Sequence, residues 1–135
     1  MSVRPARPSD RDSVFAMMAK LWPEAEDLEF NPDALFVWQR ENGHLGGFAS
    51  FSLRAYVDGC DSMPCPHVEG WWVDEDLRRT GVGRALIAAI EDWASERGFV
   101  ELGSDALLAN TRSHSAHQSI GFEPTEQLQY FRKAL

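Results

Sequence analysis

The sequence predicts one α/β (α+β) domain, residues 1–135, in which helices pack on a mixed sheet. Its composition, with 44% hydrophobic and 25% charged residues, is ordinary for a globular protein and excludes disordered and fibrous classes. A chain of 135 residues buries roughly two-thirds of its unfolded surface, enough for a core without disulfides or a metal. The apolar pattern changes repeatedly between alternation and helical spacing, with no repeat or linker between. Such mixing favours a helix-covered sheet over a bundle or a sandwich.

The first half of the chain is expected to begin with an edge strand and a helix, followed by two further strands. The segments are strand 2–5, helix 10–22, strand 34–40 and strand 44–57, with a hairpin turn at 41–43. Ser9 and Asp12 resemble a capping arrangement for the helix. Residues 23–32 are expected to form a second short helix and a loop. Their acidic side chains are either a solvated face or the rim of a site for a cationic ligand.

The second half alternates strands and helices. The expected segments are strand 67–73, helix 82–97, an extended stretch at 99–102, helix 110–120, and two short strands within 122–135. Asn110 can cap the last helix, while Gly98 and Gly121 stand where helices commonly end on a left-handed residue.

The charge balance limits the possible partners. Thirteen Lys and Arg against 21 Asp and Glu give a net charge of −8, which disfavours binding of nucleic acid. The negative charge either favours a cationic ligand or serves only to keep the protein soluble. No run reaches the roughly 18 apolar residues of a membrane-spanning helix. Residues 1–12 contain no stretch typical of a signal peptide, so we expect a cytoplasmic protein.

The two cysteines fit reduced thiols better than metal ligands. Cys60 and Cys65 are separated by four residues and lack a second ligand pair, although His67 would be a third donor for zinc. We therefore expect no metal.

The sharpest local motif lies between the strand at 67–73 and the helix at 82–97. Gly81 and Gly83 allow close approach of a ligand to the backbone, and Arg78, Arg79 and Arg84 add positive charge. The free amides and the positive dipole end of the following helix make this turn a candidate anion site, with a plain tight turn as the alternative. The spacing matches neither a dinucleotide-binding motif nor a P-loop.

Arg78-x-x-Gly81-x-Gly83 resembles the acetyl-CoA signature of the GNAT N-acetyltransferase superfamily. The later Asn110-x-x-Ser113-x-x-x-His117 resembles the second CoA-contacting helix of the same superfamily. The stretches at 69–70, 101–105 and 130–133 look like those of aminoglycoside 6'-N-acetyltransferases. The likeness covers nearly the whole chain, is strongest from 68 to 122, and is weakest from 24 to 66.

This resemblance implies a mostly antiparallel central sheet, splayed at its middle and flanked by about four helices. Acetyl-CoA would insert its pantetheine arm at the splay, and the amides of the turn would hold its pyrophosphate. The implied cofactor-binding residues are Trp71, Trp72, Val73, Arg78, Arg79, Thr80, Gly81, Val82, Gly83, Arg84, Asn110 and Ser113.

The resemblance also suggests catalytic and acceptor-binding residues. Glu69 would remove or position the proton of the amine, directly or through water; its alternative role is pairing with an arginine. His117 stands where many relatives carry a proton-donating tyrosine, so it is either the general acid or a packing residue. Asp105 would bind the amino groups of the acceptor or cap a loop. Trp22 would offer a stacking surface for sugar rings or belong to the core.

The sequence therefore predicts an acetyl-CoA-dependent N-acetyltransferase, acting on the 6'-amino group of aminoglycosides by direct attack in a ternary complex. Neither cysteine occupies a motif position suited to an acyl-enzyme. Acetylation of another small amine or of a peptide, and noncatalytic acyl-CoA binding, are the alternatives. The resemblance further implies a homodimer.

Overall fold

Four antiparallel strands lie side by side in chain order in the computed structural model, which describes residues 2–135. They are β1 (Ser2–Pro5), β2 (Leu35–Gln39), β3 (Leu45–Arg54) and β4 (Cys65–Val73). The α-helices of these residues are α1 (Arg11–Leu21), α2 (Val82–Glu96) and α3 (Thr111–Ser119). Short 3-10 turns span Pro8–Asp10, Pro32–Ala34 and Glu75–Leu77. The mixed fold is confirmed, and these strands and α-helices form where the sequence predicts them.

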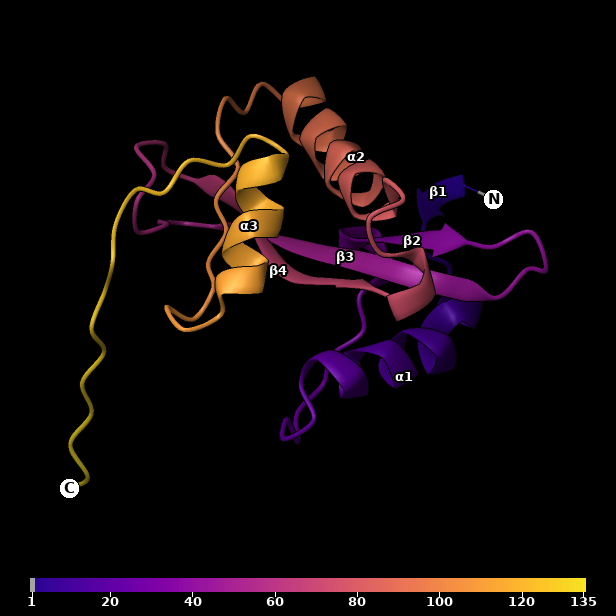
Figure 1. The fold of residues 1–135 in the computed structure, drawn as a ribbon. Coiled ribbons are helices and arrows are strands. Elements are labelled where there is room, and N and C mark those ends of the chain that lie inside the picture. The colour runs from indigo at the N-terminus through magenta and orange to yellow at the C-terminus, as the bar shows by residue number, and fades with distance from the viewer. Residues whose placement is uncertain (1) are drawn as a thin grey trace.

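The two faces of the sheet are covered by different helices, α1 on one side and α2 on the other (Figure 1). The α1 face buries Val14, Met17, Met18, Leu35, Val37 and Phe48. The α2 face buries Ala49, Phe51, Val68, Val82, Leu86, Ile87 and Ile90. Removal of these apolar side chains from water holds the layers together. Within residues 2–135, no helix combines the length and the apolarity needed to cross a bilayer.

A buried ion pair fixes the start of α1 to the edge strand β1. Asp10 accepts two hydrogen bonds from the Arg4 guanidinium, at 2.8 and 3.0 Å, and one from the amide of Arg7 at 2.8 Å. The bonds from Arg4 lower the pKa of Asp10. The resulting stability is present above the pKa of the unfolded carboxyl and is lost as the pH falls through the lower folded value. The expected capping by Ser9 and Asp12 is wrong, because Asp10 takes the N-cap position.

The sheet splays beyond β4, as predicted. Residue Gly103 pairs with β4 in parallel: its amide donates to the carbonyl of Pro66, and its carbonyl accepts from the amide of Val68, both at 2.9 Å. Within residues 2–135 this is an isolated bridge, and the extended stretch expected at 99–102 does not join the sheet, because Gly103 pairs alone and no residue of 99–102 belongs to a strand. The segment after Gly103 then diverges from β4 toward α3 (Figure 1).

Residues 23–32 do not form the expected additional helix, so three α-helices replace the predicted four within residues 2–135. The segment has a turn at 23–24 and a bend at 26, is otherwise irregular, and leads into the 3-10 turn Pro32–Ala34. Prolines at both of its ends lack the amide donor, and its crowded acidic side chains repel one another at helical spacing.

The last 13 residues do not form the two expected strands. Residues 123–135 run as an extended arm that leaves the body of the molecule (Figure 1). Their alternating pattern is that of a strand, but a strand needs a hydrogen-bonding partner. Among residues 2–135 the arm finds none, and the side chains of Leu128, Tyr130 and Phe131 are exposed.

Replacing Asp10 should strongly destabilise the fold. Asp10→Ala leaves the largely buried Arg4 without its partner and should lower the free energy of unfolding by about 3 kcal/mol. Asp12→Ala is the matched control, because Asp12 lies in the same turn with a 97% exposed side chain, and should change it by less than about 0.5 kcal/mol. Urea denaturation followed by circular dichroism measures both. Equal effects would contradict a structural role for the Arg4–Asp10 pair.

Candidate functional site

A β-bulge in β4 sets the position of Glu69. Ser50 of β3 faces Gly70 and Phe51 faces Val68, so Glu69 is the extra residue between them. Bulges re-aim a side chain locally and are frequent beside active sites. Here the bulge lies one residue beyond the Val68–Gly103 hydrogen bond, where the sheet begins to splay.

The Glu69 carboxylate is clamped by two residues of β3. Arg54 donates from Nε to Oε1 at 2.8 Å and from Nη2 to Oε2 at 2.7 Å, and Ser52 Oγ donates to Oε1 at 2.6 Å. Partial burial raises the pKa of Glu69, but these hydrogen bonds outweigh it and bring the pKa to about 2. Glu69 is therefore a fixed negative charge at neutral pH. Its pairing with an arginine, the alternative weighed from the sequence, is observed.

His67 stands between Glu69 and Asp105. The imidazole of His67 is buried on β4, with Nδ1 3.3 Å from Glu69 Oε1 and Nε2 3.7 Å from Asp105 Oδ2. Burial lowers the pKa of His67, and the positive charge of Arg54 acts in the same direction, so the ring is neutral at pH 7. The carboxyl of Asp105 is exposed.

Trp22 packs against the bulged part of β4. A Cβ atom on Gly70 would stand only 2.6 Å from the edge of the Trp22 ring and 3.1 Å from that of Phe48. Gly70 therefore provides the space in which the indole rests beside Glu69. A surface hollow of about 350 Å³ adjoins the ring and includes Glu24. Trp22 is thus brought to the same region as the two acidic residues.

The turn at 78–84 has the backbone of an anion site. Arg79 has φ +64° and Gly81 φ +93°, so left-handed residues bracket Thr80. Such alternation turns successive amides toward one point. The amide of Ala85 makes the first bond of α2, to the carbonyl of Gly81, so the preceding amides face outward at the positive helix end. Val82 is buried and anchors this end in the core.

The side chains of two arginines in this turn have structural partners. Arg78 Nε donates to the carbonyl of Val73 at 2.9 Å, and its guanidinium stacks on Trp72. Arg84 Nη2 donates to the carbonyl of Ser119 at 2.8 Å and so joins α2 to the end of α3. The anion site therefore rests mainly on backbone amides, with Arg79 as the further cation of the turn.

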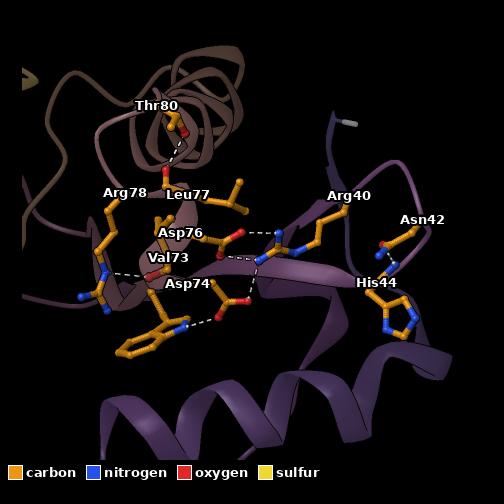
Figure 2. Close-up of polar contacts among 10 residues, drawn as sticks. Arg40, Asn42, His44, Val73, Asp74, Asp76, Leu77, Arg78 and Thr80 are labelled. Carbon is orange, nitrogen blue, oxygen red and sulfur yellow. Dashed lines mark hydrogen bonds and ion pairs between the residues drawn. The ribbon is translucent and has the colours of Figure 1, made fainter.

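Arg40 ties the β2–β3 hairpin to the beginning of this turn (Figure 2). Its guanidinium donates two hydrogen bonds to Asp76, both at 2.8 Å, and one to Asp74 at 3.0 Å. Asp74 also accepts from Trp72 Nε1 at 2.9 Å, and Thr80 Oγ1 donates to the carbonyl of Leu77. The guanidinium lowers the pKa of Asp76, so the clamp stays charged at neutral pH. Arg40 thus limits the freedom of residues 74–80.

Helix α3 presents the remaining predicted residues. Asn110 caps it by accepting from the amide of Ser113 at 3.2 Å. His117 lies 2.7 Å from the carbonyl of Ser113 through Nδ1, which must carry the proton, and 2.7 Å from Ser104 Oγ through Nε2. Its ring meets Trp71 edge-on at 5.2 Å between centroids. Trp71 in turn contacts α2, since a Cβ on Gly83 would stand 3.1 Å from its ring.

The structure therefore forms two adjoining parts. One contains Trp22, Glu69 and Asp105; the other contains the turn, Val73 and α3. Sequence reasoning missed Arg54, Arg40 and the role of His67 as the link between the carboxylates. The signal for His67 was its place two residues before Glu69 on a strand. Arg54 and Arg40 gave no signal, because strand register and hairpin direction bring them to their partners.

Comparison with known proteins agrees with this geometry. The model of the acetyltransferase (GNAT) family matches residues 7–122. The aminoglycoside N(6')-acetyltransferase type 1 of Stenotrophomonas maltophilia is 37% identical over 143 residues, which cover 99% of this chain and 94% of that protein. The enzyme of the same name from Klebsiella aerogenes is 38% identical over 146 residues, covering 98% and 96%.

A solved structure agrees as well. AAC(6')-Iy in complex with the bisubstrate analogue CoA-S-monomethyl-acetylneamine superposes with a TM-score of 0.87 at 33% identity, over 99% of this chain and 98% of that one. The fold, the turn and these matches define an acetyltransferase: this chain belongs to the GNAT family. Within that family, it is similar to the aminoglycoside 6'-N-acetyltransferases, as the sequence motifs predict.

Loss of the Arg40 clamp should weaken binding of CoA, the ligand that the motif implies for this turn. Arg40→Gln frees Asp74 and Asp76 and should raise the Kd for CoA about tenfold. The turn would then lose conformational entropy when CoA binds, and this loss weakens the affinity. Arg40→Lys should restore part of the loss. Arg11→Gln, a change at a 63% exposed arginine of α1, serves as the control. Isothermal titration calorimetry measures the Kd. Equal values in wild type and Arg40→Gln would show that the bonds of Arg40 to Asp74 and Asp76 do not support CoA binding.

Proposed function

We propose that this protein transfers the acetyl group of acetyl-CoA to the 6'-amino group of an aminoglycoside, by direct attack in a ternary complex. The observation that carries the proposal is the placement of two acidic residues, Glu69 and Asp105, on either side of His67 where the sheet splays at β4, the strand that leads into the turn at 78–84. The relatives named above, which span this chain almost completely, support the same acceptor class.

The donor would lie along the splay. The amides of residues 79–84 would bind the pyrophosphate, since a helix N-terminus supplies both donors and positive potential. Backbone groups around Val73 would pair with the pantetheine arm, with Asn110 and Ser113 on the opposite side. An amide near Val73 would polarise the thioester carbonyl as negative charge develops on its oxygen. The chain's residues thus supply binding and orientation, while the thioester supplies the activated acetyl group.

The acceptor would lie on the α1 side of the bulge. A polyamine sugar carries several positive charges and apolar ring faces, and this region offers complements to both. Trp22 provides a partly exposed ring, and Glu69 and Asp105 provide carboxylates. Exposed acidic side chains follow Trp22 in the chain: Glu24, Glu26, Asp27 and Glu29. They would raise the local concentration of a cationic acceptor.

The hydrogen bonds that hold Glu69 favour positioning of the amine over removal of its proton. A carboxylate with a pKa of about 2 is a weak proton acceptor at neutral pH. It remains ionised, however, and can hold an ammonium group at a fixed place. We therefore assign Glu69 the positioning of the amine rather than the removal of its proton.

His117 is the proposed general acid for the departing thiolate. Its ring is held by Ser113 and Ser104 and faces the splay from α3. Donation requires the imidazolium form, because the proton on Nδ1 of the neutral ring is already bonded to the carbonyl of Ser113. Packing against Trp71 and Phe122 holds the ring in this orientation.

An acceptor panel tests the proposed activity. Release of free thiol from acetyl-CoA should depend on kanamycin A, while spermidine and a peptide with a free amino terminus should be turned over poorly. Glu69→Gln removes one fixed charge and should raise the KM for kanamycin at least about tenfold with little change in CoA affinity. Glu96→Gln on α2 is the matched control. Turnover of spermidine or peptide alone would contradict the proposed acceptor class. CoA binding without turnover of any amine would contradict the proposed acetyltransferase activity.

We also propose a cytoplasmic homodimer. Both cysteines are free thiols, as expected in a reducing compartment. The exposed apolar side chains of the arm at 123–135 support association, since an extended segment with strand patterning gains hydrogen bonds by pairing with a second copy of the chain. Exchange of such an arm closes a two-fold assembly.

Charge placed on the apolar face of the arm should dissociate the dimer. Leu128→Asp with Tyr130→Asp should give the mass of one chain, and Gln127→Asp with Gln129→Asp, which adds the same charge to the other strand face, should keep twice that mass. Sedimentation velocity from 1 to about 100 μM measures both, a range that spans typical dimer affinities. A wild-type monomer at the highest concentration would refute the dimer.

A further inference from the structure

His67 is a buried polar residue that the proposed function has not used. Its side chain is 3% exposed. Gly103 makes room for the ring, since a Cβ there would stand 3.3 Å from His67 Cδ2. The backbone bonds of Gly103 to Pro66 and Val68 hold the strand on both sides of the ring. The orientation of the imidazole is therefore fixed by the pairing that begins the splay.

The surroundings of this ring are unusual for a packing residue. Within residues 2–135, His67 Nδ1 is one of three buried side-chain nitrogens that make no hydrogen bond, although Glu69 Oε1 lies 3.3 Å away. Leaving a buried polar atom unpaired is destabilising, and a phenyl ring in this place would avoid that cost. The retained imidazole thus faces carboxylates on both of its nitrogens, Glu69 on one and Asp105 on the other.

The charged and titratable groups around His67 come from four segments. Glu69 lies on β4, Arg54 on β3, and Asp105 follows Gly103; the Cys60 thiol lies beside Gly103. Arg54 is held by Glu69, and Glu69 accepts from Arg54 and Ser52 on both of its oxygens. Asp105 differs, because its side chain is 74% exposed and free to turn between solvent and His67 Nε2.

We propose that His67 is the terminal proton acceptor of the acceptor site, reached through the carboxylate of Asp105. The inference rests on the proposed function, because it requires an ammonium group held between Glu69 and Asp105. His67 does not touch the amine and acts on it only through Asp105. We therefore class it as a positioning residue and not as a catalytic residue.

The step balances without a further reactant. One N–H bond of the bound ammonium breaks, its electron pair stays on the nitrogen, and the proton bonds to an oxygen of Asp105. That proton then passes to the lone pair of His67 Nε2, while Nδ1–H faces Glu69. The ammonium becomes a neutral amine able to attack the thioester, and His67 becomes an imidazolium between two carboxylates. The proton returns to solvent through the exposed Asp105 after transfer.

The neutral state of the free ring suits this role. Burial lowers the pKa of His67, so Nε2 is vacant at neutral pH, and imidazole is a far stronger base than the clamped Glu69. The rate of acetyl transfer should therefore fall as the pH decreases through the pKa of His67 in the complex.

The test compares His67→Gln with wild type in single-turnover acetyl transfer, with saturating kanamycin A, between pH 5 and 8.5. Glutamine keeps hydrogen-bonding capacity but accepts no proton. At pH 7.5 the variant should be slower by about 100-fold, with unchanged Kd for CoA, and should lose the acidic limb of the wild-type profile. His117→Phe should be slower but keep that limb. His44→Gln, in the exposed hairpin, should match wild type.

A spectroscopic measurement removes dependence on folding of the variant. The ring ¹⁵N resonances of His67 in wild-type protein, assigned by their loss in His67→Asn or His67→Gln, should shift between pH 4.5 and 7.5 as Nε2 is protonated. A ring that keeps one protonation state over this range overturns the proposal. So does a His67→Gln variant that retains both the acidic limb and a rate within twofold of wild type.

The two proposals fail in different ways. If wild type acetylates only spermidine or peptide, the aminoglycoside assignment is wrong, and the same His67→Gln comparison with that amine decides the role of His67. If wild type acetylates kanamycin and the variant behaves as wild type, the proton acceptor is wrong and the function stands.

Discussion

Two backbone hydrogen bonds between Gly103 and β4 set the geometry of the whole site. They hold the following segment beside His67 and then release it, because pairing ends at that residue. The release brings Asp105 to one side of the splay and Ser104 to His117 on the other. The bulge at Glu69 follows immediately on β4. A single interrupted strand pairing thus creates the splay and brings polar side chains to both of its sides.

The charges on the two sides of this splay are held differently. On the proposed acceptor side, Arg54 and Ser52 hold Glu69 as an anion, while the side chain of Asp105 is exposed to solvent. On the proposed donor side, Arg78 and Arg84 are bonded to backbone carbonyls, and the proposed anion site consists of amides at the start of α2. The net charge of −8 is therefore compatible with anion binding, because a helix end supplies local positive potential.

The sequence predicted those features that depend on local spacing. Helical periodicity located α2, glycines marked its turn and its end, and Asn110 indicated the start of α3. The alternating pattern at 122–135 was not sufficient to predict a strand. Alternation makes a segment able to form a strand, but the strand also needs a hydrogen-bonding partner from another part of the structure. Residues 2–135 provide no such partner. Likewise, the acidic segment after Trp22 had helical spacing but also two prolines and strong charge repulsion.

By itself, the sequence located β1 to β4, the helices α1 to α3, the glycine-bearing turn before α2 and the family, because these depend on local patterns and contiguous motifs. Only the tertiary structure decided which side chains act together. Arg54 meets Glu69 through the register of β3 and β4, and Arg40 meets Asp74 and Asp76 because the hairpin folds back onto the turn. His67 faces two carboxylates for the same reason. Such contacts depend on strand register and on where pairing stops, which no local pattern of residues encodes.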